Sequence, residues 1–204
     1  MANVNVAFGL KPINTAGSTP ATQGTNAYLI ASDASAIFQG SAVKAVNGGS
    51  IAIGSASGDT VAFVGVFAGC EYVSSSTGKK VFSNYWPGSG ADTNFDIIGH
   101  VYDNPLQRFV VCTDATFTNQ ATAEAAIFEN TQFDSGASGS TTTGISSAKM
   151  DVATLDSSNT SLPLKIVGIM DDPDNADYAA AGLPVIVMFN NHALLQADSE
   201  AAIS

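Results

Sequence analysis

The chain has 204 residues, of which 45% are hydrophobic and only 12% are charged, so it can bury a core without disulfide or metal staples. Seven basic residues against eighteen acidic ones give a formal net charge of −11, and Arg108 is the only arginine. Because phosphate groups and anionic lipids are bound by clusters of Lys and Arg, this charge balance argues against nucleic acid and against a membrane surface as partners.

The first 25 residues contain a few apolar positions and then Gly, Ser, Thr, Pro and Asn without periodicity. Phe8 and Leu10 flank Gly9 in this segment, which favours an extended arm at residues 1–25 that docks on another surface, outside the periodic core. A disordered tail is the alternative. The segment lacks the features of a secretory signal, and no apolar run approaches the roughly 20 residues that span a bilayer. We therefore expect a soluble protein that is made in a cytoplasm.

Residues 26–204 are predicted to form one β-domain, because short runs of β-branched and aromatic residues alternate with turns rich in Gly, Asn and Pro. The predicted strands cover residues 28–31, 37–46, 51–53, 61–73, 79–86, 95–102, 108–113, 164–170 and 184–189. This pattern is typical of an all-β antiparallel barrel or sandwich. Gly65, Gly99 and Gly168 lie inside predicted strands, which indicates bends or bulges that curl a sheet.

The clearest single pattern is a β-hairpin over residues 61–88, in which a Ser/Thr/Gly turn at residues 74–78 joins two strands. Six of the seventeen aromatic residues of the chain lie in this segment. Trp86, the only tryptophan, ends the returning strand beside Pro87. We favour a core or interface anchor for Trp86; a platform on which a sugar ring stacks is the alternative.

Three further segments complete the prediction. Only residues 120–130 have the composition of a helix, so at most one short helix is expected. Residues 132–149 are rich in Ser, Thr and Gly and are expected to form an exposed loop that carries no core, in preference to a linker. Cys70 and Cys112 lie in apolar, strand-like surroundings and are expected to be buried thiols rather than a single bridge.

The sequence contains no recognisable reactive motif. A Gly-x-Ser-x-Gly nucleophile turn is missing, because Ala56 occupies the nucleophile position between Gly54 and Gly58. His100 and His192 lack the spacing of zinc ligands. The acidic residues 171–177 favour a surface turn over a calcium loop, since the glycine and distant Glu of an EF-hand are missing. We therefore expect no catalytic residues, no cofactor and no metal, and a protein that is not an enzyme.

Short motifs spread over most of the chain have a common resemblance. They are MANVNVAFGLKP at the start, Gly65-Val66-Phe67-x-Gly69-Cys70-x-Tyr72, Thr77-Gly78-Lys79, Phe82-Ser83-Asn84-Tyr85-Trp86-Pro87-Gly88, Ser140-Thr141-Thr142-Thr143-Gly144 and Asn190-Asn191-His192. Together they resemble the capsid decoration (cement) proteins of tailed bacteriophages, of the type found in marine and cyanobacterial phages. The resemblance brings no catalytic residues with it.

The resemblance implies a viral structural protein on the capsid exterior of the virion, made in the host cytoplasm. Such a protein binds the major capsid protein, assembles as a homo-oligomer that is expected to be a trimer, and stabilises the assembled shell by bridging its subunits. The alternatives are a phage tail, fibre or minor head protein, or a carbohydrate-binding β-module. The residues expected at the capsid or subunit interface are Phe8, Leu10, Phe82, Tyr85 and Trp86.

Overall fold

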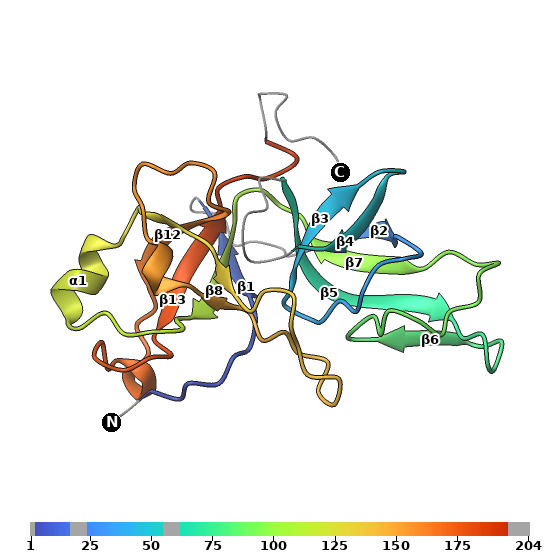
Figure 1. Cartoon of the computed structure of the whole chain (residues 1–204), viewed down its shortest axis with the longest axis horizontal. Helices are drawn as coiled ribbons and strands as arrows, with labels where there is room; N and C mark the ends of the chain where they lie inside the picture. Colours follow the sequence, from blue (N-terminus) through green and yellow to red (C-terminus); the bar gives the residue numbers. More distant parts are fainter. Residues whose placement is uncertain (1–2, 17–23, 55–61, 196–204) are drawn as a thin grey trace.

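The computed structural model describes residues 3–16, 24–54 and 62–195 (Figure 1). One sheet contains β2 (Asn26–Ile30), β3 (Ala42–Val46), β4 (Ser50–Ile53), β5 (Phe63–Val73), β6 (Lys80–Ser83) and β7 (Ile98–Tyr102). The second sheet contains β1 (Lys11–Thr15), β8 (Gln107–Cys112), β9 (Asn130–Thr131), β12 (Leu164–Ile169) and β13 (Pro184–Phe189). The remaining elements are β10 (Phe133–Asp134), β11 (Lys149–Met150), the helix α1 (Gln120–Ala125) and two 3-10 turns, η1 (Val152–Thr154) and η2 (Pro173–Asn175).

The first sheet closes into a five-stranded barrel. Its strand order is β3-β4-β2-β7-β5-β6, and an additional pairing of β3 with β5 completes the ring, so β6 extends beyond the barrel as an edge strand. The pairings are antiparallel except for the parallel pair β2–β4. The second sheet has the order β1-β8-β13-β12-β9. The prediction of an all-β barrel or sandwich with at most one short helix is confirmed, and the parallel pair β2–β4 is the departure from the antiparallel pairing that was expected.

Glycines lie at or beside three of the four register shifts between the described strands, and the fourth falls at Ile13 in the β1–β8 pair. The three shifts at glycines fall beside Gly65 in the β3–β5 pair, at Gly69 in the β5–β7 pair and at Gly168 in the β12–β13 pair. At Gly65 the backbone has φ of +154°, and a Cβ atom there would collide with the carbonyl oxygen of Tyr102. The bulges predicted at Gly65 and Gly168 are therefore confirmed, and they let the strands bend around the two cores. Gly99 pairs in regular register with Tyr28 and Cys70, so the bulge predicted there is not found.

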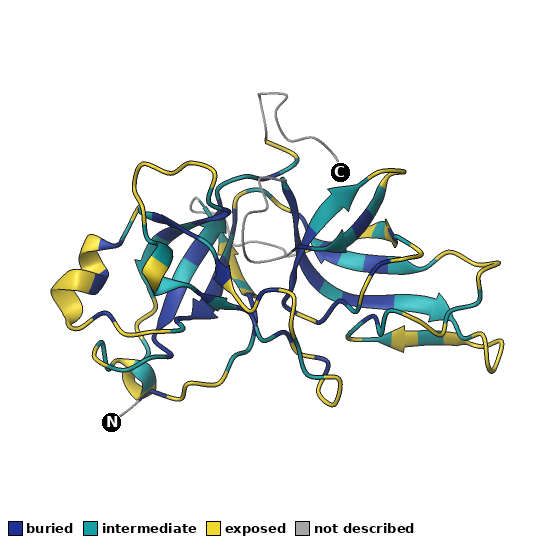
Figure 2. Cartoon of the chain, in the orientation of Figure 1, coloured by how far each residue is buried: buried dark blue, intermediate teal, exposed yellow. Residues whose placement is uncertain are grey.

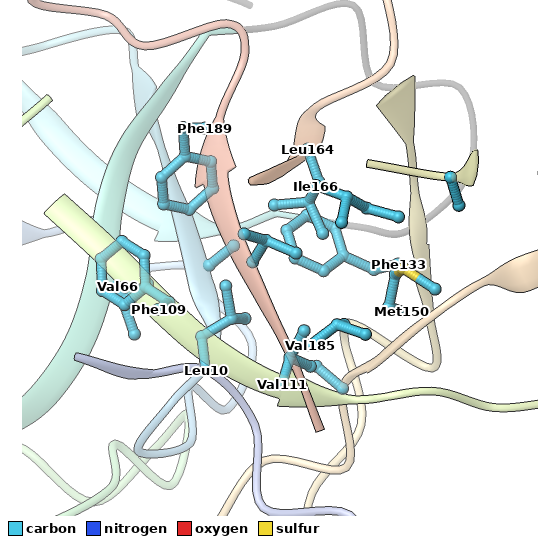
Figure 3. Packing of buried hydrophobic residues seen from close by; sticks show 14 of the residues in the cluster. Leu10, Val66, Phe109, Val111, Phe133, Met150, Leu164, Ile166, Val185 and Phe189 are labelled. Atoms are coloured by element: carbon cyan, nitrogen blue, oxygen red, sulfur yellow. The ribbon is translucent and has the colours of Figure 1, made fainter. Parts of the chain in front are cut away.

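Two hydrophobic cores share the wall formed by β3 and β5. From β5, Phe67 and Cys70 point into the barrel core, whereas Phe63 and Val66 pack in the second core (Figure 3). From β3, Val43 belongs to the barrel core and Ala42 to the second. Because both faces of β5 are buried (Figure 2), its sequence is an almost uninterrupted apolar run rather than an alternating one.

The predicted hairpin and helix are present. β5 and β6 pair in register from Cys70↔Ser83 to Val73↔Lys80, so the hairpin is confirmed, and Val61 lies outside the described residues. In α1 the Asn119 side chain accepts a hydrogen bond from the N–H of Thr122, which is a helix cap. Cys70 and Cys112 are both buried and free, as predicted.

The prediction that residues 132–149 carry no core is wrong at both ends of the segment. Phe133 and Ala148 are buried in the second core, and Ser146 is also buried. The short strands β10 and β11 bring these ends together. The Ser/Thr/Gly composition describes the exposed middle of the segment, but it hides two apolar residues that flank it.

The N-terminal segment lies along the second sheet as part of the fold. β1 pairs with β8, and the N–H of Leu10 donates to the carbonyl oxygen of Gly40 at 2.9 Å. Leu10 is only 1% exposed and belongs to the second core. The prediction that Leu10 lies outside the core as a docking anchor is therefore wrong, because its side chain is already bound by its own chain.

Candidate interaction surfaces

The five residues predicted at an interface do not form one surface. Leu10 and Trp86 are buried in different cores. Tyr85 is half-buried and stacks on the ring of Phe38, with centroids 5.7 Å apart. Phe8 is half-buried and Phe82 is 72% exposed. Only Phe8 and Phe82 therefore present substantial apolar surface for another molecule.

Trp86 is a core residue of the barrel. Its side chain is 1% exposed, its indole N–H donates to the carbonyl oxygen of Ala34 at 3.2 Å, and its ring meets Tyr72 edge-on at a centroid distance of 5.2 Å. A buried ring with its N–H satisfied cannot stack on a sugar. The core interpretation of Trp86 is confirmed, and the sugar-platform interpretation is wrong.

The edge strand β6 of the hairpin carries an exposed aromatic side chain, Phe82, close to Lys80. Phe82 lies opposite Glu71 across the hairpin, and the Nζ atom of Lys80 is 2.9 Å from a carboxylate oxygen of Glu71 and 5.4 Å from the centre of the Phe82 ring. In the turn, the N–H of Ser74 donates to the carbonyl oxygen of Lys79 at 2.9 Å. The hairpin is thus a fixed platform, and it extends away from the second sheet (Figure 1).

The outer face of the second sheet contains an apolar groove of about 500 Å³. The N-terminal segment forms one wall, β1 and β8 form its floor, and the chain that follows β12 forms the other wall. Val4 and Val6 are 64% and 65% exposed on this surface. The residues that line the groove are Val4, Val6, Phe8, Lys11, Pro12, Ile13, Val110, Met170, Asp172, Asn175, Gly182 and Pro184.

The acidic loop, residues 171–177, holds the N-terminal wall of this groove in place. The carboxylate of Asp172 caps η2 by accepting from the N–H of Asp174 at 3.1 Å. The Asn175 side-chain oxygen accepts from the N–H of Val4 at 2.8 Å, and Asn3 accepts from the N–H of Asp177 at 2.9 Å. The interpretation of this segment as a capped surface turn is confirmed. Within the described ranges, no group of three or more His, Cys, Asp or Glu side chains is arranged to hold a metal ion.

The groups with shifted pKa values are mostly buried and structural. Burial, together with a 2.6 Å hydrogen bond to the Asp103 carboxylate, raises the pKa of Tyr28 to about 12. Burial raises the pKa of Cys70 to about 12 and also raises that of Cys112, which keeps both thiols protonated and unreactive. Burial lowers the pKa of His192, whose Nδ1 accepts from the N–H of Leu194 at 3.2 Å. None of these groups lines the apolar groove.

A second concavity, of about 370 Å³, lies on the barrel. Exposed Leu29 and Phe95 line it together with the carboxylates of Asp92 and Asp96. We refer to it as the barrel groove. It is an alternative receptor for an apolar side chain on this molecule.

Comparison of the chain with protein-family models, with curated proteins and with solved structures finds no match. In the part of the chain that the structure describes, no helix has the length and apolar character to cross a membrane.

Proposed function

We propose that this protein decorates an assembled phage capsid and stabilises it by bridging major capsid subunits, as a homo-oligomer. The observation that carries the proposal is the apolar groove, which is preformed, exposed and lined mostly by apolar side chains. Concentrated apolar surface marks a site that binds other protein, which in a decorating homo-oligomer includes a neighbouring copy. The motifs that resemble decoration proteins supply the identity of the partner, and the low fraction of charged residues suits a surface that packs against protein.

The physical mechanism is added interface. Each copy that spans a joint between shell subunits buries surface that exists only in the assembled shell, so its binding favours the assembled state. A homo-oligomer attaches at several points, and the second and third contacts form at high effective concentration. Modest individual contacts then give strong attachment, without any chemical step.

The test is to mix the purified protein with heads that lack it and to measure bound copies per shell subunit. We expect saturable binding at a fixed ratio to the major capsid protein, together with a higher melting temperature of the decorated shell. Copy number in purified virions separates the alternatives: many copies at a fixed ratio support decoration, and a handful support a tail, fibre or minor head protein. Heads that bind nothing and show no change in melting would contradict the proposal.

A further inference from the structure

We propose that copies of this chain bind one another head to tail, with the β5–β6 hairpin of one copy seated in the apolar groove of the next. The occupant of the groove is thus a second copy, and its anchor is Phe82. This inference rests on the proposed function in one respect, because it names the contact that would build the homo-oligomer.

The hairpin has the properties of an inserting element. Phe82 is the most exposed of the large hydrophobic side chains in the described part of the chain, at 72%. It lies on β6, which pairs with β5 on one side and, among the described residues, with no strand on the other. The ion pair between Lys80 and Glu71 and the hydrogen-bonded turn fix the backbone that carries it. Because this backbone is already ordered, a partner that buries Phe82 has to order only the side chain.

The groove has the properties of a receptor. Its walls are held by hydrogen bonds that link Asn3 to Asp177 and Val4 to Asn175. Its surface is mainly apolar, from Val6 on one side to Met170 on the other. A preformed apolar cavity with few polar groups gains affinity from an apolar side chain without the cost of ordering itself.

The charges at the two sites are complementary. Lys79 is exposed in the turn at the end of the hairpin. The charge of the adjacent Lys80 is balanced by Glu71, so Lys79 supplies the positive charge of the tip. The acidic loop that borders the groove carries Asp171 and Asp174, whose carboxylates have no ion-pair partner among the residues that the structure describes. Lys11 is the one cation in the groove lining, and its Nζ lies over the Phe8 ring at 4.5 Å. In a chain with a net charge of −11, a basic tip against an acidic rim favours the correct pairing over others.

The positions of the two sites select a contact between copies. The hairpin and the N-terminal wall of the groove lie at opposite ends of the molecule (Figure 1), so one copy cannot fill its own groove. A contact that joins different surfaces on the two copies forms a ring if the rotation closes, and a filament if it does not. A closed ring agrees with the trimer that the sequence resemblance implies.

The mass of the full-length protein in solution tests this contact, by light scattering and sedimentation. We expect wild type to form a closed oligomer, and Phe82→Asp and Val6→Asp each to weaken assembly by about tenfold or more. Both side chains are exposed, so both variants should melt like wild type. Phe128→Asp is the matched control, since Phe128 is 71% exposed but lies outside both sites, and it should assemble normally. Phe95→Asp should also assemble normally, which separates the apolar groove from the barrel groove.

Mixing the two variants gives a sharper result. A Val6→Asp copy still has its hairpin and a Phe82→Asp copy still has its groove, so a mixture should form a pair through one intact contact and stop there. Lys79→Glu should weaken assembly, and adding Asp174→Lys in the same chain should restore it. A monomeric wild type, assembly that survives both variants, or a mixture without pairs would each overturn the contact. These results do not involve heads, so a failure of shell binding would contradict the proposed function and leave the contact standing.

Discussion

At the scale of single residues, Trp86 is the anchor of the barrel core. The substitution Trp86→Ala removes both the edge-on contact of the indole ring with Tyr72 and its hydrogen bond to Ala34. We expect the free energy of unfolding to fall by about 3–5 kcal/mol, as for other buried aromatic residues. Urea unfolding measures this change. Phe82→Ala is the control, and because Phe82 is exposed it should change the stability by less than about 0.5 kcal/mol. A loss below about 1 kcal/mol for Trp86→Ala would contradict the core assignment.

Leu10 shows that an apolar residue type does not by itself determine whether the side chain is buried. Val6 and Leu10 are both apolar residues of the N-terminal segment, but the first is exposed and the second is buried. Their sequence context is similar, and the difference arises because the chain turns at Gly9, whose φ is +67°, and then enters β1. This turn directs Leu10 into a core made by strands far away in the sequence. The local sequence pattern carries no information about those strands.

Leu10→Ala should therefore destabilise the fold. Removing a buried Leu side chain from the second core lowers the free energy of unfolding by about 2–5 kcal/mol. Val6→Ala provides the matched comparison, with an expected change of less than about 0.5 kcal/mol. Equal effects of the two substitutions in urea titrations would mean that the N-terminal segment is a detachable arm after all.

His192 gives the stability a pH dependence whose sign is fixed by its burial. Its pKa in the folded protein is lowered from 6.5 by burial, although the nearby Asp103 acts in the opposite direction. The unfolded chain therefore binds the proton more tightly, so stabilisation that is present above pH 6.5 is lost as the pH falls through the lowered pKa. In His192→Asn, whose side chain can still accept from Leu194, the free energy of unfolding should depend less on pH in this window. Parallel pH profiles for wild type and variant would show that His192 does not titrate in this way.

At the scale of elements, the sequence predicts those strands that are long enough to show an apolar or alternating pattern of their own. Each predicted strand has a counterpart, with ends that differ by up to five residues, as where the strand predicted from residue 37 begins at Ala42. β1 (Lys11–Thr15) was not predicted, because it is an exposed edge strand whose sequence is mostly polar. The two-residue strands β9, β10 and β11 are too short to show a period. These elements exist because the neighbouring strands supply hydrogen-bonding partners.

A substitution at Gly65 tests whether β5 must lie this close to β7. In Gly65→Ala the new methyl group would collide with the backbone of Tyr102 and Asp103. We expect destabilisation of about 3 kcal/mol or more, the upper range for forcing a group into a packed site. Gly24→Ala is the control, because nothing lies within 4 Å of its added Cβ, and it should change stability by less than about 1 kcal/mol. A fully stable Gly65→Ala protein would show that β5 and β7 can separate at this bulge.

At the scale of the whole molecule, the sequence predicts an all-β barrel or sandwich, but it does not predict the second core or the interaction surfaces. The second core combines β5 with strands that follow it by many residues. The only sequence signal that β5 is shared by two cores is its apolar run. Of the predicted interface residues, Phe82 and Phe8 lie on the two surfaces of the proposed contact. The rest of the groove comes from residues such as Val110 and Met170, which become neighbours only through the fold.

The shared wall makes a prediction about unfolding. The barrel cannot lose β5 without removing Phe63 and Val66 from the second core, so both cores should unfold in a single transition. Trp86 emission reports on the barrel and the methyl resonances of Val187 report on the second core, and both should change at the same urea concentration. Leu164→Ala, which removes a side chain from the second core alone, should lower both midpoints equally. Two separate midpoints, or a Trp86 midpoint that Leu164→Ala leaves unchanged, would mean that the barrel and the second sheet are independent units joined only by the chain.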